Sequence, residues 1–422
     1  MTSKVRFDDA FERAVEFAHA HRSKLGPTVI VRDLLGRFRF AFEEELDDTA
    51  ALAAELHAQL GAFSPGQSQL FMSRSEMLAP DAIFSAPELH DLGGEVRLLE
   101  RWVTGSDWLR PPLPQPSVKA ERITFFGIKG GVGRSSAIAA VSRHLAEQGK
   151  RVVVFDLDLE SPGVTASLLP SASRPTYGIV DWFVEDDVGQ ADENLLRDLV
   201  ATSPLAAGTT GEIRVVPAGG TRGSESYTSK LARIYSSPPG RGDLAARLAR
   251  LLEAVEHSER ADYVLLDSRA GIHDLAAIAV TRLGATSLLF AIDTPQTWLA
   301  YGYLFATWQR DPARVRHFRD HLRIIAAQVP ETGRELYLER LRDHASALFE
   351  EYLYDPADAD DSDAFNFDVS DRDAPHSPVP IYWRRELQDW DPTREPATVT
   401  PEQASAAFGE LLQYIDQWTA ES

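Results

Sequence analysis

A glycine-rich loop between a strand-length apolar run and a helical segment most constrains the fold of this 422-residue chain. The loop reads Lys129-Gly130-Gly131-Val132-Gly133-Arg134-Ser135-Ser136; the apolar run Ile123 to Ile128 precedes it and a predicted helix from Ser135 to Gln148 follows. Glycines let backbone N–H groups turn inward around phosphate oxygens, and the N-terminus of a following helix adds free donors and the positive end of its dipole. The segment therefore predicts a phosphate-binding loop.

Two later apolar runs end in aspartates. Val152 to Asp156 is a predicted strand with Asp158 two residues beyond its end, and Tyr263 to Asp267 is a second, followed closely by Gly271. In P-loop proteins an aspartate at the end of a buried strand helps to hold the magnesium ion. Aspartates that only cap helices would explain any one of these segments. The three segments together, in this order, favour a nucleotide site.

The chain from Arg122 onward alternates predicted strands and helices. This alternation predicts an α/β fold, with a mostly parallel sheet flanked by helices. The proline-rich residues 111–118 predict a linker between an N-terminal domain at 1–110 and a larger domain at 119–422. Further strands are expected at Ile213 to Val216, Ser287 to Ile292 and Leu322 to Ala327, with helices at Asp243 to Glu256 and Ile272 to Leu283.

Residues 1–110 predict a small α+β domain without a chemical signature, so we expect this domain to dock a partner protein. Helical spacing of apolar residues predicts its helices, and β-branched or aromatic runs predict its strands. The predicted elements are a helix from Asp8 to His21, strands at Thr28 to Val31 and Phe38 to Phe42, a helix from a cap at Thr49 to Leu60, and a short helix at Leu98 to Val103.

In their residues and order, the three motifs resemble the ParA/MinD family of P-loop ATPases, whose loop reads KGGxGK[ST]. Lys129 occupies the place of the family's signature lysine at the front of the loop. The segment around Asp156 and Asp158 resembles the first switch of that family, and the segment from Asp267 to Gly271 resembles its Walker B strand and second switch. Val215 to Gly220 is similar to a further strand end of the family.

This resemblance, which covers residues 120–330, implies an ATPase that uses ATP and Mg²⁺. It implies that Ser135 binds Mg²⁺ directly while Asp156 and Asp267 hold its waters, since Mg²⁺ keeps several waters. It also implies that Asp158 orients the attacking water. The residues expected to contact the nucleotide are Lys129, Gly130, Gly131, Val132, Gly133, Arg134, Ser135, Ser136, Gln328 and Pro330, the last two beside the adenine.

The resemblance further implies a homodimer with ATP sandwiched between two protomers. Lys129 of one protomer would reach the nucleotide of the other, placing positive charge where the γ-phosphoryl group develops negative charge. Two positions depart from the family. Arg134 replaces the loop lysine; its forked guanidinium still suits phosphate oxygens, so binding is expected to survive while fast hydrolysis is not implied. Glu160 stands where many family members carry glutamine, and we expect a surface acid there.

The net charge of −21 restricts the partners of the chain. Residues 1–110 hold 12 Lys/Arg and 18 Asp/Glu, which places −6 there and −15 in the remainder. Proteins that coat nucleic acid gain affinity when Lys and Arg replace phosphate counterions, so DNA binding is possible but disfavoured. The most evident local basic group, which is expected to form a solvated helix face, consists of Lys230, Arg233, Arg241, Arg247 and Arg250.

The absence of cysteine excludes iron–sulfur clusters and cysteine-ligated zinc, which some relatives of this ATPase type use. The sequence has no apolar run of about 18 residues and no apolar stretch behind its first charges, so we expect a cytoplasmic protein without a membrane contact. A C-terminal apolar stripe lacks the Lys and Arg of a membrane-binding helix and is expected to pack in the core. Its residues are Phe408, Leu411, Leu412, Ile415 and Trp418.

Two hypotheses about output remain. In the first, the protein hydrolyses ATP and cycles between monomer and dimer as a switch for a partner protein. In the second, it is a nucleotide-bound scaffold with little turnover that docks its partner through residues 1–110. The sequence leaves both open because function resides in sites added to a fold rather than in the fold itself.

Overall fold

The computed structural model describes residues 4–114, 120–236, 240, 242–356, 364–387, 390–393 and 400–421. The chain divides into two units, Met1–Pro111 and Pro112–Ser422. Residues 115–119, which include part of the predicted linker, lie outside the described residues.

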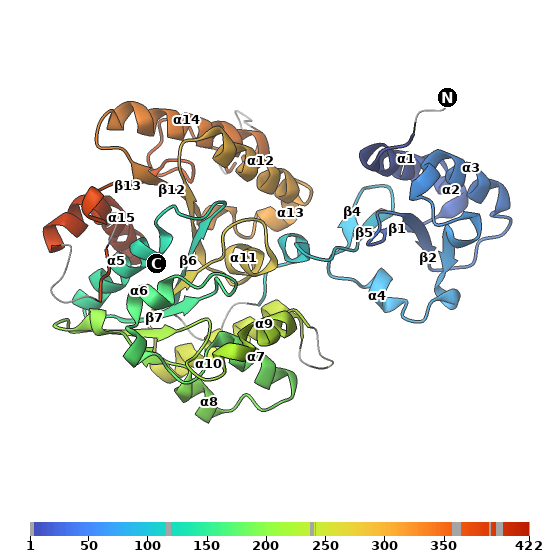
Figure 1. Cartoon of the computed structure of the whole chain (residues 1–422). Coiled ribbons are helices and arrows are strands. Elements are labelled where there is room, and N and C mark those ends of the chain that lie inside the picture. Colours follow the sequence, from blue (N-terminus) through green and yellow to red (C-terminus); the bar gives the residue numbers. More distant parts are fainter. Residues whose placement is uncertain are drawn as a thin grey trace. The chain divides into compact units, whose positions relative to one another are not determined.

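The second unit is built on a sheet with the strand order β13-β12-β11-β6-β10-β7-β9-β8 (Figure 1). Its neighbouring strands pair in parallel, except for the antiparallel pair β8 and β9. The predicted α/β class with a mostly parallel sheet is thus confirmed. The strands are β6 (Glu121–Gly127), β7 (Arg151–Asp156), β8 (Ala201–Thr202), β9 (Glu212–Val216), β10 (Tyr263–Asp267), β11 (Thr286–Ala291), β12 (Leu322–Val329) and β13 (Val379–Tyr382).

Helices cover both faces of this sheet (Figure 1). Val152 and Val154 of β7 pack in one core with α5, α6 and α15, whereas Val153 and Phe155 pack in the other with α7, α10 and α11. Burial on both faces explains why these strands read as continuous apolar runs. The helices are α5 (Arg134–Glu147), α6 (Val164–Leu168), α7 (Ile179–Asp187), α8 (Glu193–Asp198), α9 (Tyr227–Ile234), α10 (Leu244–Glu259), α11 (Asp274–Ala277), α12 (Pro295–Gln309), α13 (Pro312–Val315), α14 (Arg334–Tyr352) and α15 (Pro401–Glu421).

Two segments of this unit refine the predicted elements. The helix expected at Ile272 to Leu283 is α11, continued by a π-helical turn at Ile278–Arg282. The apolar stripe of α15 packs in the core as predicted, since Phe408, Leu411 and Ile415 are buried there. In the described part of the chain, no helix combines the length and apolar character needed to cross a membrane.

Of the basic residues on α9 and α10, Arg233 and Arg250 are exposed as expected, but Arg247 does not belong to a solvated face. Arg247 is fully buried and bonds to Asp186 at 2.9 Å and to the Phe183 carbonyl at 2.7 Å. Lys230 lies 2.6 Å from the Asp181 carboxylate, and Arg250 lies 2.9 Å from Asp186. A buried guanidinium must be paired, so Arg247 holds α10 to α7 instead of facing a polyanion. Arg241 lies outside the described residues.

The first unit contains a mixed sheet with the strand order β3-β2-β1-β5-β4. Helices α1 and α3 pack on the face that presents Ile30, Phe38 and Phe40, while α4 packs on the face of Val29 and Val31. The elements are α1 (Phe7–Ala20), α2 (Arg22–Leu25), β1 (Thr28–Arg32), β2 (Phe38–Phe42), α3 (Ala50–Leu60), β3 (Phe71–Ser73), α4 (Asp81–Phe84), β4 (His90–Asp91) and β5 (Val96–Glu100).

The short helix predicted at Leu98 to Val103 is wrong. Leu98 and Leu99 belong to β5, which pairs in parallel with β1 and in antiparallel fashion with β4. Leu98 and Leu99 are buried in the cores on opposite faces of the sheet. A strand buried on both faces needs adjacent apolar residues, and this requirement produced a pattern that resembles a helix.

Candidate nucleotide site

The glycine loop connects the end of β6 to the start of α5. Gly131 and Gly133 have φ of 75° and 84°, a left-handed conformation that glycine adopts readily. A Cβ atom added at Gly130, Gly131 or Gly133 would meet nothing within 4 Å, so the surface above the loop is open. Gly133 caps α5, whose first turn offers backbone N–H groups toward this surface. The loop therefore has the construction of an anion cradle.

Asp156 and Asp267 stand directly beside each other at the ends of β7 and β10. Both are buried. Asp156 Oδ2 accepts hydrogen bonds from Thr165 Oγ1 at 2.6 Å and from the Thr165 backbone N–H at 3.1 Å. Within the described chain, the buried Asp156 Oδ1 has no hydrogen-bond partner. Burial raises the pKa of both carboxyls, and the charge of Asp267 raises that of Asp156 further.

Ser135 of the glycine loop contacts Asp267 at the end of β10. Ser135 Oγ donates to Asp267 Oδ2 at 3.2 Å. Together with the unpartnered Asp156 Oδ1, these groups form a set of oxygen donors around two buried acids. Oxygen ligands on two adjacent acidic side chains suit Mg²⁺, so the residues present fit the predicted ion. When bound, Mg²⁺ would neutralise phosphate charge next to Ser135.

Arg134 points into the same group of acids. Its side chain is 8% exposed, with Nη2 3.6 Å from Asp158 Oδ2 and Nε 3.5 Å from Asp267 Oδ1. Its Nη1 also donates to the Lys129 carbonyl at 3.4 Å. Burial raises the pKa of Asp158, and the positive charge of Arg134 opposes this shift. The guanidinium thus lies against two carboxylates that were predicted to serve magnesium and the attacking water.

The other residues predicted to contact the nucleotide differ in their exposure and in their contacts. Lys129 is exposed at the front of the loop and Ser136 is half-buried. Gln328 donates from Nε2 to the Gly131 carbonyl at 2.6 Å and has a left-handed φ of 55°. This bond ties the end of β12 to the loop. Pro330, two residues on, is half-buried.

Glu160 is not the free surface acid that was expected. Its side chain is 22% exposed, and its Oε1 lies 2.6 Å from Arg269 Nη1. Tyr235 donates its hydroxyl to the same oxygen at 2.6 Å. Sequence reasoning gave no role to Arg269, although it lies in the segment from Asp267 to Gly271, and it missed Tyr235, which lies outside the nucleotide motifs. The sequence did contain a signal for this pair. Glu160 and Arg269 carry opposite charges, and each follows shortly after a predicted strand that ends in an aspartate.

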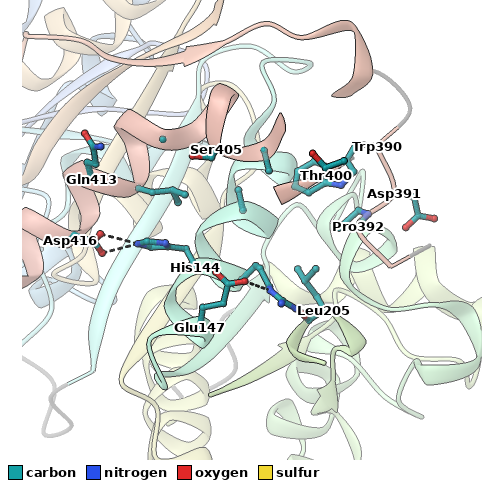
Figure 2. A pocket seen from close by; sticks show the side chains of 15 residues that line it. His144, Glu147, Leu205, Trp390, Asp391, Pro392, Thr400, Ser405, Gln413 and Asp416 are labelled. Atoms are coloured by element: carbon teal, nitrogen blue, oxygen red, sulfur yellow. Dashed lines mark hydrogen bonds and ion pairs between the residues drawn. The ribbon is translucent and has the colours of Figure 1, made fainter. Parts of the chain in front are cut away.

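A cavity of about 630 Å³ lies away from the loop, between α5 and α15 (Figure 2). It is lined by the C-terminal half of α5, including His144, whose Nε2 lies 2.8 Å from Asp416 Oδ1. None of the predicted nucleotide residues lines it. This cavity is therefore not the predicted site.

A phosphate loop of this construction, with its serine bonded to the aspartate of the neighbouring strand, defines the class of P-loop nucleotide-binding domains. The second unit is a domain of that class. Residues 123–308 match the family model described as "CobQ/CobB/MinD/ParA nucleotide binding domain". The predicted resemblance to the ParA/MinD type of P-loop ATPase is thereby confirmed for this part of the chain.

The individual relatives have low sequence identity to this chain. The antiactivator FleN of Pseudomonas aeruginosa is 26% identical over 217 residues, which are 51% of this chain and 65% of the relative. The chromosome-partitioning ATPase Soj of Thermus thermophilus is 27% identical over 171 residues, 39% of this chain and 64% of the relative. The chain thus spans just under two thirds of these relatives. A solved ParA family ATPase from Chlorobium tepidum has 15% identity and a TM-score of 0.45, covering 69% of this chain and 98% of that one.

Proposed function

We propose that this chain binds ATP with Mg²⁺ and hydrolyses it as an ATP-dependent homodimer that acts as a switch for a partner protein. The observation that carries the proposal is the open glycine loop next to Ser135, Asp267 and the buried Asp156. The match of residues 123–308 to the ParA/MinD-type domain supports the choice of nucleotide.

Each residue has a distinct task in this proposal. The backbone N–H groups from Gly130 to Ser136 hold phosphate oxygens, and Ser135, Asp156 and Asp267 hold the ion and its waters. Asp158 accepts a hydrogen bond from the attacking water and orients it. Lys129 is exposed, as a residue must be that reaches the nucleotide of a second protomer. Gln328 and Pro330 border the adenine.

A scaffold with bound nucleotide and little turnover is the second candidate, and the position of Arg134 favours it. The guanidinium lies 3.6 Å from Asp158 and 3.5 Å from Asp267. A cation at that distance competes with a water molecule for the carboxylate that would orient it. Slow hydrolysis with intact binding would follow if this contact persists when ATP is bound.

The partner is proposed to be a protein that docks on residues 1–110. The acidic balance of the chain and the ion pairs of Lys230, Arg247 and Arg250 support a protein over DNA. The names of the two relatives describe different functions, an antiactivator and a chromosome-partitioning ATPase, so they do not indicate which function this chain has.

Purified full-length chain with ATP and Mg²⁺ tests the proposal. Release of phosphate that is lost in both Lys129→Ala and Asp158→Ala, with a dimer seen by light scattering only when ATP is present, supports the hydrolysing dimer. ATP that stays bound without phosphate release supports the scaffold. Failure to bind ATP at all refutes both.

A further inference from the structure

We propose that Glu160 is a positioning residue for ATP hydrolysis, because it fixes the segment that carries Asp158 to the segment that follows Asp267. This inference rests on the proposed ATPase function and deepens it. The first segment, Asp156 to Gly163, follows β7, and the second, Asp267 to His273, follows β10. The two strands are parallel neighbours, so these segments leave the same edge of the sheet side by side.

Three side chains converge on one oxygen of Glu160. Arg269 Nη1 lies 2.6 Å from Oε1, the Tyr235 hydroxyl donates to it at 2.6 Å, and His273 Nε2 lies 3.8 Å away. The side chains of Glu160, Arg269 and His273 are 22%, 31% and 22% exposed. A carboxylate that serves two donors from two different elements in a half-buried setting joins those elements.

Arg269 supplies the positive charge of this group. Burial lowers the pKa of His273, so its imidazole is neutral near pH 7. Burial, followed by the bond to Glu160, raises the pKa of Tyr235, so its hydroxyl keeps the proton that it donates. The link between the two segments is therefore a charge-assisted bond from Arg269, reinforced by a neutral donor.

Asp158 is held from both sides along the chain. On one side, the Leu157 N–H donates to the Asp267 carbonyl at 3.0 Å. On the other, the Leu159 carbonyl accepts from the Tyr227 hydroxyl at 2.6 Å, and Glu160 then bonds to Arg269. The first and last of these contacts lead to the segment after β10. Removal of the Glu160 contact leaves the backbone of Asp158 attached to that segment at one end only.

The free energy of the Glu160–Arg269 ion pair distinguishes a positioning role from a contribution to the stability of the fold. A partly exposed ion pair contributes little to folding, so its loss should leave the domain folded. A small displacement of a group that orients the attacking water, in contrast, lowers turnover strongly. A positioning role therefore predicts a loss in kcat with little change in melting temperature or in affinity for ATP.

The test compares full-length Glu160→Gln, Arg269→Gln and the double variant with the wild type. We expect kcat to fall about 10-fold or more in each single variant, with KM for ATP within about 2-fold. We expect the double variant to be no slower than the worse single variant, since both changes break one contact. A matched control is Glu147→Gln, which breaks the exposed 2.7 Å pair with Arg143 on α5 and should leave kcat unchanged.

A second readout does not depend on activity. Hydrogen exchange of the backbone amides between residues 157 and 163 should accelerate in Glu160→Gln and Arg269→Gln, but not in Glu147→Gln. Unchanged exchange and unchanged kcat in Glu160→Gln overturn the inference. Additive losses in the double variant also overturn it. A wild-type chain that releases no phosphate refutes the proposed ATPase, and the exchange measurement then decides about the link by itself.

Discussion

The pair of buried aspartates leads to a counterintuitive prediction, in which removal of a site residue stabilises the protein. Asp156 and Asp267 are buried side by side, and within the described chain Asp156 Oδ1 has no hydrogen-bond partner. In Asp156→Asn, the amide oxygen can keep both bonds from Thr165. The amide nitrogen then replaces the unpartnered oxygen, and one of two adjacent buried negative charges disappears.

The gain follows from the removal of a buried charge that lacks a partner and lies beside a second acid. An unsatisfied buried group costs about 1–3 kcal/mol, and more when it is charged, so the neutral amide destabilises the folded state less than the carboxylate does. Without Mg²⁺ and nucleotide, we therefore expect Asp156→Asn to raise the free energy of unfolding by about 1–3 kcal/mol. Because the unit Pro112–Ser422 is larger than about 250 residues, each kcal/mol should raise its Tm by at most about 2 °C. Asp198→Asn at an exposed site is the control and should change stability by less than about 0.5 kcal/mol.

The stability that Asp156→Asn gains over the wild type should increase as the pH rises. Because the pKa of Asp156 is raised in the folded state, the wild type loses stability as pH rises from its ordinary value of 3.8 through the raised value. The advantage of Asp156→Asn should therefore be largest near about pH 8 and vanish below about pH 3, where Asp156 is protonated in both the folded and the unfolded state. Mg²⁺ with ATP should shrink it, since ligand that binds the folded wild type stabilises that state. Thermal melts of variant and wild type across this range decide: a variant that melts below the wild type at about pH 8 refutes the reasoning.

Three further predictions concern turnover, assembly and stability. Asp158→Ala should bind ATP and accumulate as a dimer, because the attacking water loses its acceptor; light scattering that shows only monomer with ATP contradicts this. Arg134→Lys should raise kcat at least about 3-fold, because the shorter ammonium group gives up contacts with Asp158; an equal or lower kcat contradicts it. Glu256→Ala should cost about 3–5 kcal/mol in chemical unfolding, because it removes the carboxylate that pairs with the buried Arg122 guanidinium at 2.7 and 2.8 Å and leaves that charge uncompensated. The exposed Glu147→Ala should cost at most about 1 kcal/mol, and similar losses in the two variants would refute the argument.

The sheet of the second unit could be predicted closely from the sequence because its strands are buried on both faces. Tyr263 to Asp267 coincides with β10, and the run before the loop differs from β6 by two residues at its start and by one at its end. A continuous apolar run bounded by polar residues has few alternative interpretations when helices alternate with it. The same reasoning failed at Leu98 to Val103, where pairing with the distant β1 turns a short apolar segment into a strand.

The loop and its acids could also be located from the sequence, but their mutual contacts could not. A phosphate loop is a local motif, and the aspartates are placed by strand ends, so Ser135 and Asp267 were expected around the same magnesium ion, but not in direct contact as they are in the structure. The direction of the Arg134 side chain depends on burial and on neighbours from two other strands. The Glu160–Arg269 contact likewise requires the order of strands in the sheet, in which β7 and β10 are adjacent although more than one helix separates them in the sequence.

Arg134, which replaces the loop lysine of the family, and the Glu160–Arg269 ion pair both affect the carboxylate of Asp158. Arg134 and Arg269 both lower the pKa of Asp158, against the upward effect of its burial. Two guanidinium groups with free access to Asp158 would neutralise the charge that it needs to orient water. Glu160 holds Arg269 at 2.6 Å, whereas Arg134 lies 3.6 Å from Asp158. Glu160 therefore provides the second arginine with a carboxylate of its own, and it leaves Asp158 with the weaker of the two contacts.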